Sequence, residues 1–294
     1  MLAADDASSS RGGLLRNLPI ARLALYPALA YSFLFFVVPF LVMFCVSFWQ
    51  RTRGRMEATW VLDNYTRFFS RDYLVDALYN SAEVTVFTTI ISVMIAYPLA
   101  YILAFRVPQK WQKLILLTTV LPFWTAYVVR SYSWLLVLAD NGIINSALVR
   151  VGLVAEPLTL AYTRGATVLG FVHFFTMLLT LTIYSSLIQI PRNFKQAASD
   201  LGASPLQTFL HVTLPLSVPG VAVGAFLTFV ITIGDYITPQ ILGGNSEVLI
   251  PQAIILQVQR SANFPMAAVM SLVLMVLVTC VYLLFNRHLK MDRL

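Results

Sequence analysis

The sequence predicts an all-α integral membrane protein with six transmembrane helices and a cytoplasmic helix–Gly–helix hairpin between the fourth and the fifth. Three observations predict this fold class. Hydrophobic residues make up 59% of the 294 residues and charged residues only 11%, which is too little charge for the surface of a soluble protein. Six apolar stretches are long enough to cross a hydrocarbon core of about 30 Å. A polar segment with helix-capping residues separates the fourth stretch from the fifth.

The six predicted spans follow a polar leader, residues 1–22, that reads as a tail. They lie at residues 23–49, 80–105, 114–139, 165–188, 217–241 and 266–286. The first apolar run is too long for the core of a cleavable signal peptide, so we expect it to be a retained membrane anchor. Cys45 and Cys280 both fall within spans and are expected to be packing residues.

The distribution of Lys and Arg predicts that both termini are cytoplasmic. With the N-terminus inside, the inner segments carry eleven basic residues and the outer loops eight, five of them in the first outer loop, residues 50–78. If that long loop is set aside, the count is eleven against three. This orientation places residues 189–216 in the cytoplasm. This use of basic residues in membrane orientation also explains the net charge of +7. Nucleic-acid binding would need a basic cluster, and the sequence has none.

The loops and span ends carry further signals. The aromatic residues and mixed charges of the first outer loop predict that it folds against the bundle. The second outer loop, residues 140–164, opens with the turn signal Asp140-Asn141-Gly142 and continues into "IINSALVRVGL", which predicts a short surface helix.

The segment between the fourth and fifth spans, "NFKQAASDLGASPLQTFLHVTLPLSVPG", reads as two short helices joined at Gly202. Asn193 is expected to cap the first helix, and Gly202 falls where a left-handed C-terminal cap would lie. Ser204, Pro205 and Gln207 form a capping box that starts the second helix, which Leu214-Pro215 is expected to end before the fifth span. Apolar residues at helical spacing would either pack on the membrane helices or dock a soluble partner.

This segment resembles the signature of the permease subunits of type I ATP-binding-cassette (ABC) importers. That signature is Glu-Ala-Ala, three residues, Gly, nine residues and Ile-x-Leu-Pro. The sequence has Gln196-Ala197-Ala198, then Gly202, then Val212-Thr213-Leu214-Pro215 at matching spacing. The resemblance implies that Gln196, Ala197, Ala198, Gly202, Leu214 and Pro215 couple the bundle to an ATPase. Gln in place of Glu removes a charge.

The resemblance covers most of residues 78–286 and implies the remaining organisation. Residues 23–77 would be the first helix and outer loop, 78–286 the importer transmembrane domain, and 287–294 a cytoplasmic tail. The protein would be a multi-pass protein of the bacterial inner membrane. Its implied partners are ABC ATPase subunits, a second related permease in a heterodimer and a substrate-binding protein. No cofactor is expected in this chain, and ATP and Mg would be bound by the partner ATPase.

The stretches "VLPFWTAYVVRSYSWLLVLADNGIINSAL" and "GDYITPQILGG" resemble the permeases of spermidine/putrescine importers, so polyamines are the implied substrate. The alternative is the same kind of importer for another small solute, such as an opine-like or quaternary amine, iron or thiamine. An ion-coupled secondary transporter is the rival from another class, although such a carrier has no need of a docking hairpin.

Charges inside the membrane are costly and usually functional. Arg130 and Asp235 are expected about 24 and 27 Å from the cytoplasmic face, so they either form a structural ion pair or Asp235 faces the pathway and meets a cationic substrate. Nearby aromatic rings could bind a cation, and Glu83 could add a second carboxylate. The residues predicted to line the pathway are Asp235, Tyr236, Trp124, Tyr127, Glu83 and Arg130.

The sequence contains no motif for catalysis. No glycine is followed by lysine, so there is no phosphate-binding loop, and there is no nucleophile elbow or H-E-x-x-H. The three histidines and two cysteines lack metal-ligand spacing. His173, alone on an apolar span, is expected to be a buried hydrogen-bonding residue. The chain is therefore predicted to be a transport subunit rather than an enzyme, with ATP hydrolysis on another polypeptide.

Overall fold

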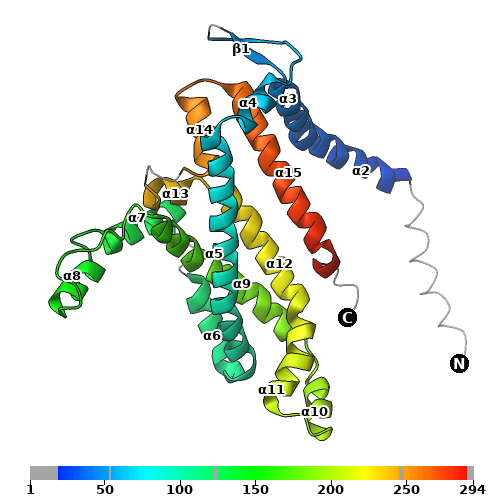
Figure 1. Ribbon diagram of the computed structural model, residues 1–294. Helices are drawn as coiled ribbons and strands as arrows, with labels where there is room; N and C mark the ends of the chain where they lie inside the picture. The colour runs from blue at the N-terminus through cyan, green and yellow to red at the C-terminus, as the bar shows by residue number, and fades with distance from the viewer. Residues whose placement is uncertain (1–18, 53, 122–124, 245–247, 290–294) are drawn as a thin grey trace, which may run out of the picture.

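The computed structural model describes residues 19–52, 54–121, 125–244 and 248–289, and within them the chain is helical apart from one small β-hairpin (Figure 1). The N-terminal and outer-loop elements are α2 (Pro19–Ser32), η2 (Phe33–Val37), α3 (Val38–Ser47), β1 (Gln50–Thr52), β2 (Arg55–Glu57) and α4 (Asp63–Phe69). The middle of the chain forms α5 (Asp72–Phe105), α6 (Gln109–Val120), α7 (Tyr127–Leu138), α8 (Ile143–Arg150) and α9 (Arg164–Leu187). The remainder forms α10 (Arg192–Asp200), α11 (Pro205–Thr208), η4 (Phe209–Thr213), α12 (Leu214–Gly234), α13 (Ile237–Leu242), α14 (Ile250–Gln259) and α15 (Phe264–Leu289).

Five helices in the described part of the chain are long and apolar enough to cross a membrane. They are Tyr26–Ser47, Asp72–Phe105, Arg164–Leu187, Pro205–Gly234 and Phe264–Asn286. They correspond to the first, second, fourth, fifth and sixth predicted spans. The second begins eight residues earlier than expected because α5 continues outward from the apolar core as an amphipathic helix.

The third predicted span, residues 114–139, is not one continuous helix. α6 ends at Val120, and α7 starts only at Tyr127, after Ala126 in an extended conformation with ψ 129°. Each of the two helices has 12 residues, too few to cross a bilayer alone. The prediction of a continuous third helix was therefore wrong.

The centre of the bundle consists of α5, α9 and α12, which pack along most of their length. Ala96, Ala100 and Leu103 of α5 meet Leu179 and other buried residues of α9. α12 approaches α9 through two glycines, because a Cβ at Gly220 or Gly224 would overlap the side chains of Ser186 or Thr182. Small residues at such contacts allow membrane helices to pack closely. These contacts pack α5, α9 and α12 closely against one another.

Two of the long helices contain a π-helical turn immediately before a proline. In Tyr26–Ser47, Val38 donates its N–H to the carbonyl of Phe33, and Pro39 follows. In Pro205–Gly234, Leu214 donates its N–H to the carbonyl of Phe209, and Pro215 follows. Proline lacks an N–H and its ring clashes with the carbonyl four residues earlier. A single wider turn relieves that clash without ending the helix.

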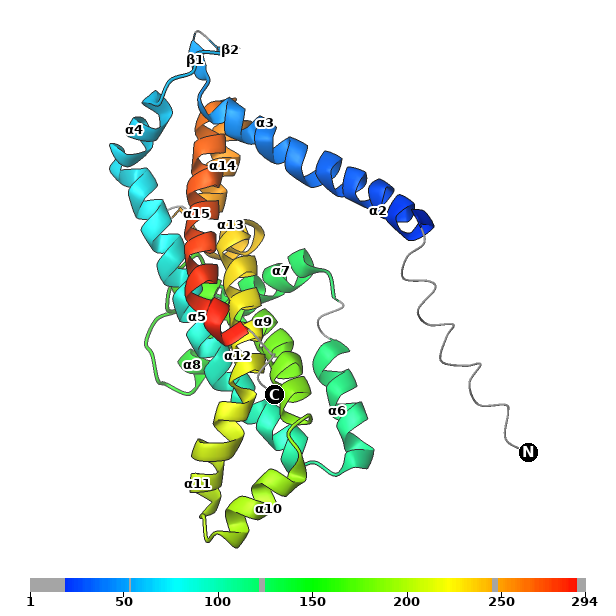
Figure 2. The ribbon, with the colours of Figure 1, turned by 90° about the vertical axis from the view of Figure 1, so that its right-hand side faces the viewer.

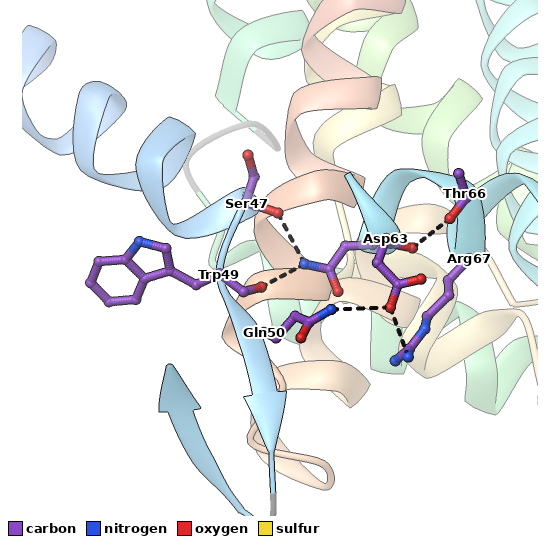
Figure 3. Close-up of polar contacts among 7 residues, drawn as sticks. Ser47, Trp49, Gln50, Asp63, Thr66 and Arg67 are labelled. Atoms are coloured by element: carbon purple, nitrogen blue, oxygen red, sulfur yellow. Dashed lines mark hydrogen bonds and ion pairs between the residues drawn. The ribbon is translucent and has the colours of Figure 1, made fainter. Parts of the chain in front are cut away.

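The first outer loop is folded against the bundle, as predicted, and it carries the antiparallel hairpin of β1 and β2 (Figure 1). The buried Asn64 side chain donates hydrogen bonds to the carbonyls of Ser47 (3.0 Å) and Trp49 (2.7 Å), where the chain leaves α3 (Figure 3). Gln50 and Arg67 both contact the Asp63 carboxylate. These polar contacts fix the exit of the first helix, whereas α2 diverges from the other helices (Figure 2).

Candidate functional site

The segment between α9 and α12 forms the predicted helix–Gly–helix hairpin, α10 followed by α11, at the end of the bundle opposite the β-hairpin (Figures 1 and 2). Gly202 has φ +81°, the left-handed conformation that glycine adopts without steric cost. Ala203 donates its N–H to Ala198 (3.0 Å) and Gly202 donates to Ser199 (2.9 Å). These two bonds are the Schellman motif that ends a helix by satisfying its last carbonyls.

The second helix of the hairpin starts with the predicted capping box. The Ser204 hydroxyl accepts from the N–H of Gln207 (3.3 Å), and the Gln207 side chain accepts from the N–H of Ser204 (2.8 Å), with Pro205 in the first turn. The expected cap at Asn193 was wrong. The first helix starts at Arg192 after Pro191, because proline is favoured at helix starts and sets the boundary two residues earlier.

The expected helix end at Leu214-Pro215 was also wrong. α11, the π turn η4 and α12 run on as one helical segment from Pro205 to Gly234. Leu214 and Pro215 directly follow the π turn, whose wider hydrogen bonding accommodates the proline inside the longer helix. The hairpin and the fifth span are therefore parts of one continuous element.

Aromatic and cationic contacts attach the hairpin and the turn that follows it to α5. The ring of Phe209 packs edge-on against Tyr97 and Tyr101 of α5, with centroids 5.9 and 5.5 Å apart. The Lys195 ammonium lies over the ring of Phe105, 2.8 Å from its centroid, and burial lowers the pKa of Lys195 to about 8. These contacts attach the hairpin to the end of α5.

The hairpin and the turn that follows it also carry large exposed apolar side chains. Leu201 is 89% exposed and Leu206 is 66% exposed. The other exposed apolar side chains of this surface are Phe194 and Leu210. Gln196 and Ala197 are exposed as well, and Ala198 is half-buried. We call this set the docking face.

A second cluster surrounds Asp235, where α12 ends and the chain turns into the short helix α13. Asp235 adopts an extended conformation with ψ 129°, so the fifth predicted span ends here rather than at residue 241. The carboxylate accepts from the N–H groups of Ile237 (3.0 Å) and Thr238 (3.2 Å). It thereby caps α13, as carboxylates commonly do at helix starts.

Tyr127, at the start of α7, joins this cluster from the broken third span. Its hydroxyl donates to the Asp235 carboxylate (2.5 Å) and also contacts the Thr238 hydroxyl. Asp235 remains half-buried, and the neighbouring Tyr236 is 42% exposed. The cluster therefore combines a carboxylate with two aromatic rings at the end of α12 away from the hairpin.

Arg130 lies one helical turn beyond Tyr127 and is only 7% exposed. Its guanidinium stacks over the rings of Phe174 (4.5 Å to the centroid) and Tyr127 (5.3 Å). Among the described residues, the ion pairs are Arg164–Glu83 and Arg67–Asp63, so the direct Arg130–Asp235 pair left open by the sequence is not formed there. Rings of α7 and α9 neighbour the guanidinium instead.

Two predicted pathway residues, Glu83 and Trp124, and the predicted hydrogen-bonding residue His173 remain. Glu83 has a separate set of contacts, since Arg164 donates to it (2.6 Å) and to Asn80 (2.7 Å), joining α5 to the start of α9. Trp124 lies outside the described residues. His173 accepts a hydrogen bond from the Trp134 indole (3.0 Å), which confirms the expected hydrogen bond, but it is half-buried rather than buried.

Sequence reasoning missed Thr238 and Phe174. Thr238 is a small residue in a Pro-containing segment, and only the fold brings its hydroxyl to Tyr127. Phe174 is one of three phenylalanines on α9, with nothing in its local sequence to distinguish it. The spacing of Arg130 three residues after Tyr127 was the available signal, because such residues share a helix face.

The chain resembles known proteins over most of its length. Residues 26–290 match the family described as "Binding-protein-dependent transport system inner membrane component". The spermidine/putrescine transport system permease protein PotB of Escherichia coli (strain K12) is 29% identical over 255 residues, covering 86% of this chain and 92% of that protein. The protein of the same name from Haemophilus influenzae (strain ATCC 51907 / DSM 11121 / KW20 / Rd) is 30% identical, covering 90% and 93%.

Among solved structures, a chain of a bacterial ABC transporter involved in the import of the acidic polysaccharide alginate has the same fold. The TM-score is 0.73 at 16% sequence identity, with 92% of this chain and 95% of that chain covered. A second structure, of an alginate ABC transporter in complex with an alginate pentasaccharide-bound periplasmic protein, gives a TM-score of 0.74 at 15% identity, with 92% and 94% covered. Identity this low supports the shared fold and nothing about the solute.

Proposed function

The chain belongs to the family of binding-protein-dependent transport system inner membrane components, and from this premise we propose that the solute it transports is a polyamine such as spermidine or putrescine. It is a multi-pass permease subunit of an ABC importer. The similarity to spermidine/putrescine permeases over 86% of the chain supports the solute, and so does the carboxylate with aromatic rings around Asp235, a combination suited to ammonium groups. Membership of this family argues against the alternative of an ion-coupled secondary transporter.

We propose that the docking face couples this subunit to the ATPase. Both hairpin helices are capped by their own residues, so the backbone needs no partner to form. The apolar side chains of Leu201 and Leu206 nevertheless stay exposed, at an end of the bundle where we expect water rather than lipid. Exposed apolar anchors on a rigid helical element are typical of helix-in-groove recognition. The proposed occupant of this face is an ABC ATPase that binds ATP and Mg, with Gln196, Ala197, Ala198 and Gly202 at the contact.

We propose six membrane crossings, with the third made of α6 and α7 together. Two helices of 12 residues each give about 36 Å of helix, enough for a hydrocarbon core of about 30 Å. Both termini and the docking face would then be cytoplasmic. The contact between Lys195 and Phe105 agrees with this, because it brings the hairpin to the same end of the bundle as the end of α5.

A complete importer would contain further chains. The proposed set is two ATPase subunits, a second and related permease that forms a heterodimer with this chain, and a substrate-binding protein that delivers the polyamine from the outer side. The pathway would pass the cluster of Asp235, Tyr127 and Tyr236. Arg130, held over two rings, would lie beside Tyr127, and Trp124 and Glu83 are further proposed pathway residues.

The test is uptake of labelled spermidine into proteoliposomes that contain this subunit co-purified with its native partners. The binding protein is added outside, ATP and Mg are trapped inside, and no ion gradient is imposed. We expect uptake that requires ATP and that excess putrescine inhibits. ATPase activity that the loaded binding protein stimulates, without polyamine uptake, would contradict the solute and leave the ABC permease standing.

A further inference from the structure

A cleft at the outer end of the bundle lies apart from the contacts described around Asp235. It has a volume of about 490 Å³ and lies between the first turns of α5 and the helix α14, with Arg164 at its inner end. Small-molecule sites commonly measure about 300–1,000 Å³. We call it the outer cleft. Its polar lining comes from Tyr73, Asp76 and Asn80, which share one face of α5, and from Gln257 of α14.

The outer cleft is lined by one acidic residue, Asp76, and one basic residue, Arg164, and the basic residue is already paired. Arg164 donates to the carboxylate of Glu83 (2.6 Å) and to the amide oxygen of Asn80 (2.7 Å). Asp76 takes no part in either ion pair of the described residues, Arg164–Glu83 or Arg67–Asp63. The carboxylate of Asp76 is therefore the charged group of the lining with which a cationic ligand could pair.

The floor of the outer cleft is apolar. Ala77 of α5 and Ala253 of α14 are buried, and Leu256 and Val248 complete the floor. Arg71, which is not a lining residue, donates to the hydroxyl of Tyr73 (3.2 Å), and Tyr73 and Asp76 share one face of α5 because they are three residues apart. A carboxylate and a ring at the rim above an apolar floor match a primary ammonium group followed by an alkyl chain. A small inorganic cation would gain nothing from such a floor.

We propose that the outer cleft is a binding site for a primary alkylamine, which receives one aminoalkyl arm of the polyamine on the outer side of the membrane. This inference rests on the proposed function for the identity of its ligand. The ammonium group binds the Asp76 carboxylate and faces the Tyr73 ring. The alkyl chain lies over Ala77 and Ala253. The cleft is a subsite that the solute meets before it reaches Asp235.

The experiment measures equilibrium binding of labelled spermidine to the whole importer complex in lipid nanodiscs, without the binding protein and at low salt. Asp76→Asn is compared with Asp72→Asn, which removes an exposed carboxylate one turn earlier on α5 that does not line the cleft. We expect Asp76→Asn to weaken binding about tenfold, the range of one charge-assisted hydrogen bond, and Asp72→Asn to leave it unchanged. Binding should weaken as salt rises, and n-butylamine should compete better than ammonium ion.

Equal binding by wild type and Asp76→Asn would overturn the outer cleft as an amine site, as would loss of the same size in Asp72→Asn. ATP-driven uptake measured on the same preparations keeps the two proposals distinguishable. Normal spermidine uptake without Asp76-dependent binding contradicts the cleft and leaves the proposed function intact. Asp76-dependent binding without uptake contradicts the proposed solute and supports the cleft as an alkylamine site.

Discussion

The hairpin of α10 and α11 and the cluster around Asp235 lie at the two ends of one helical segment, and they are built in opposite ways. The hairpin is held by bonds between residues close in sequence, such as Ser204 with Gln207 and Ala203 with Ala198, while its large apolar side chains stay exposed. The Asp235 cluster joins residues more than a hundred positions apart, since Tyr127 binds both Asp235 and Thr238. The comparison teaches that one end can change partners without refolding and the other cannot.

The largest effect we expect comes from Gly202→Val. The φ of +81° at this position costs a residue with a side chain about 1–2 kcal/mol, and a β-branched residue more. The strain falls on the docking face, so we expect at least tenfold less ATPase to co-purify with a subunit that still inserts in the membrane. Quantitative immunoblotting of the purified complex measures the retained ATPase.

The matched control for Gly202 is Gly152→Val. Gly152 has φ +74°, and, as at Gly202, an added Cβ would have nothing within 4 Å. It follows α8, outside the hairpin. ATPase retention should be unaffected there. Equal loss in both variants would mean that general instability, rather than the docking face, controls retention.

At the other end of the helical segment, Asp235→Asn and Asp235→Ala separate the charge from the helix cap. Asn still accepts hydrogen bonds from the start of α13, so we expect assembly and thermal stability close to wild type, with ATP-driven spermidine uptake reduced at least tenfold. Ala removes the cap as well, which costs about 1 kcal/mol and should lower the midpoint of thermal unfolding. Uptake by Asp235→Asn at the wild-type rate would assign this carboxylate a purely structural role.

Tyr127→Phe should have a smaller effect than either Asp235 variant. It removes the hydroxyl that binds Asp235 and Thr238 but keeps the ring beside Arg130. The loss of one hydrogen bond to a charged group is about 1.5–3 kcal/mol, partly recovered if the outer path admits water. We expect uptake to fall severalfold with unchanged ATPase retention. Reduced retention instead would show that the two ends are not separable.

The smallest effect concerns the attachment of the hairpin. Burial lowers the pKa of Lys195 to about 8, against 10.5 for an exposed lysine, so between these values the unfolded state binds more protons and the attachment strengthens as pH rises. Acylation of Lys195 should reach half its maximal rate near pH 8, as measured by mass spectrometry of the labelled peptide. Phe105→Ala opens the site to water and should raise that midpoint. An unchanged midpoint would contradict burial against Phe105.

The hairpin could be predicted from the sequence because its signals are local. Gly202, Ser204, Pro205 and Gln207 each act within one helical turn, and all four occupy their predicted positions. The errors in this region concern prolines. Pro191 set the start of α10, and Pro215 was tolerated inside a longer helix because the π turn before it absorbs the clash.

The Asp235 cluster could be predicted only in part. Charge inside an apolar stretch marked Arg130 and Asp235 as exceptional, and helical spacing placed both at similar depth. Which groups meet them was not predictable, because it depends on the break between α6 and α7 and on the extended conformation at Asp235. Those breaks bring Tyr127 to Asp235 and leave Arg130 over the ring of Phe174.

The uninterrupted helix from Pro205 to Gly234 has a mechanical consequence. Its 30 residues form a rod about 45 Å long, with the docking face beside one end and Asp235 at the other. The π turn of η4 is its most compliant point, since hydrogen bonding there departs from the regular pattern. The part of the helix beyond that turn, α12, is about 30 Å long at about 1.5 Å per residue. A tilt of about 10° at the turn would therefore displace the far end of α12 by about 5 Å. Such a lever would move the carboxylate of Asp235 relative to Tyr127 without bending any other part of α12.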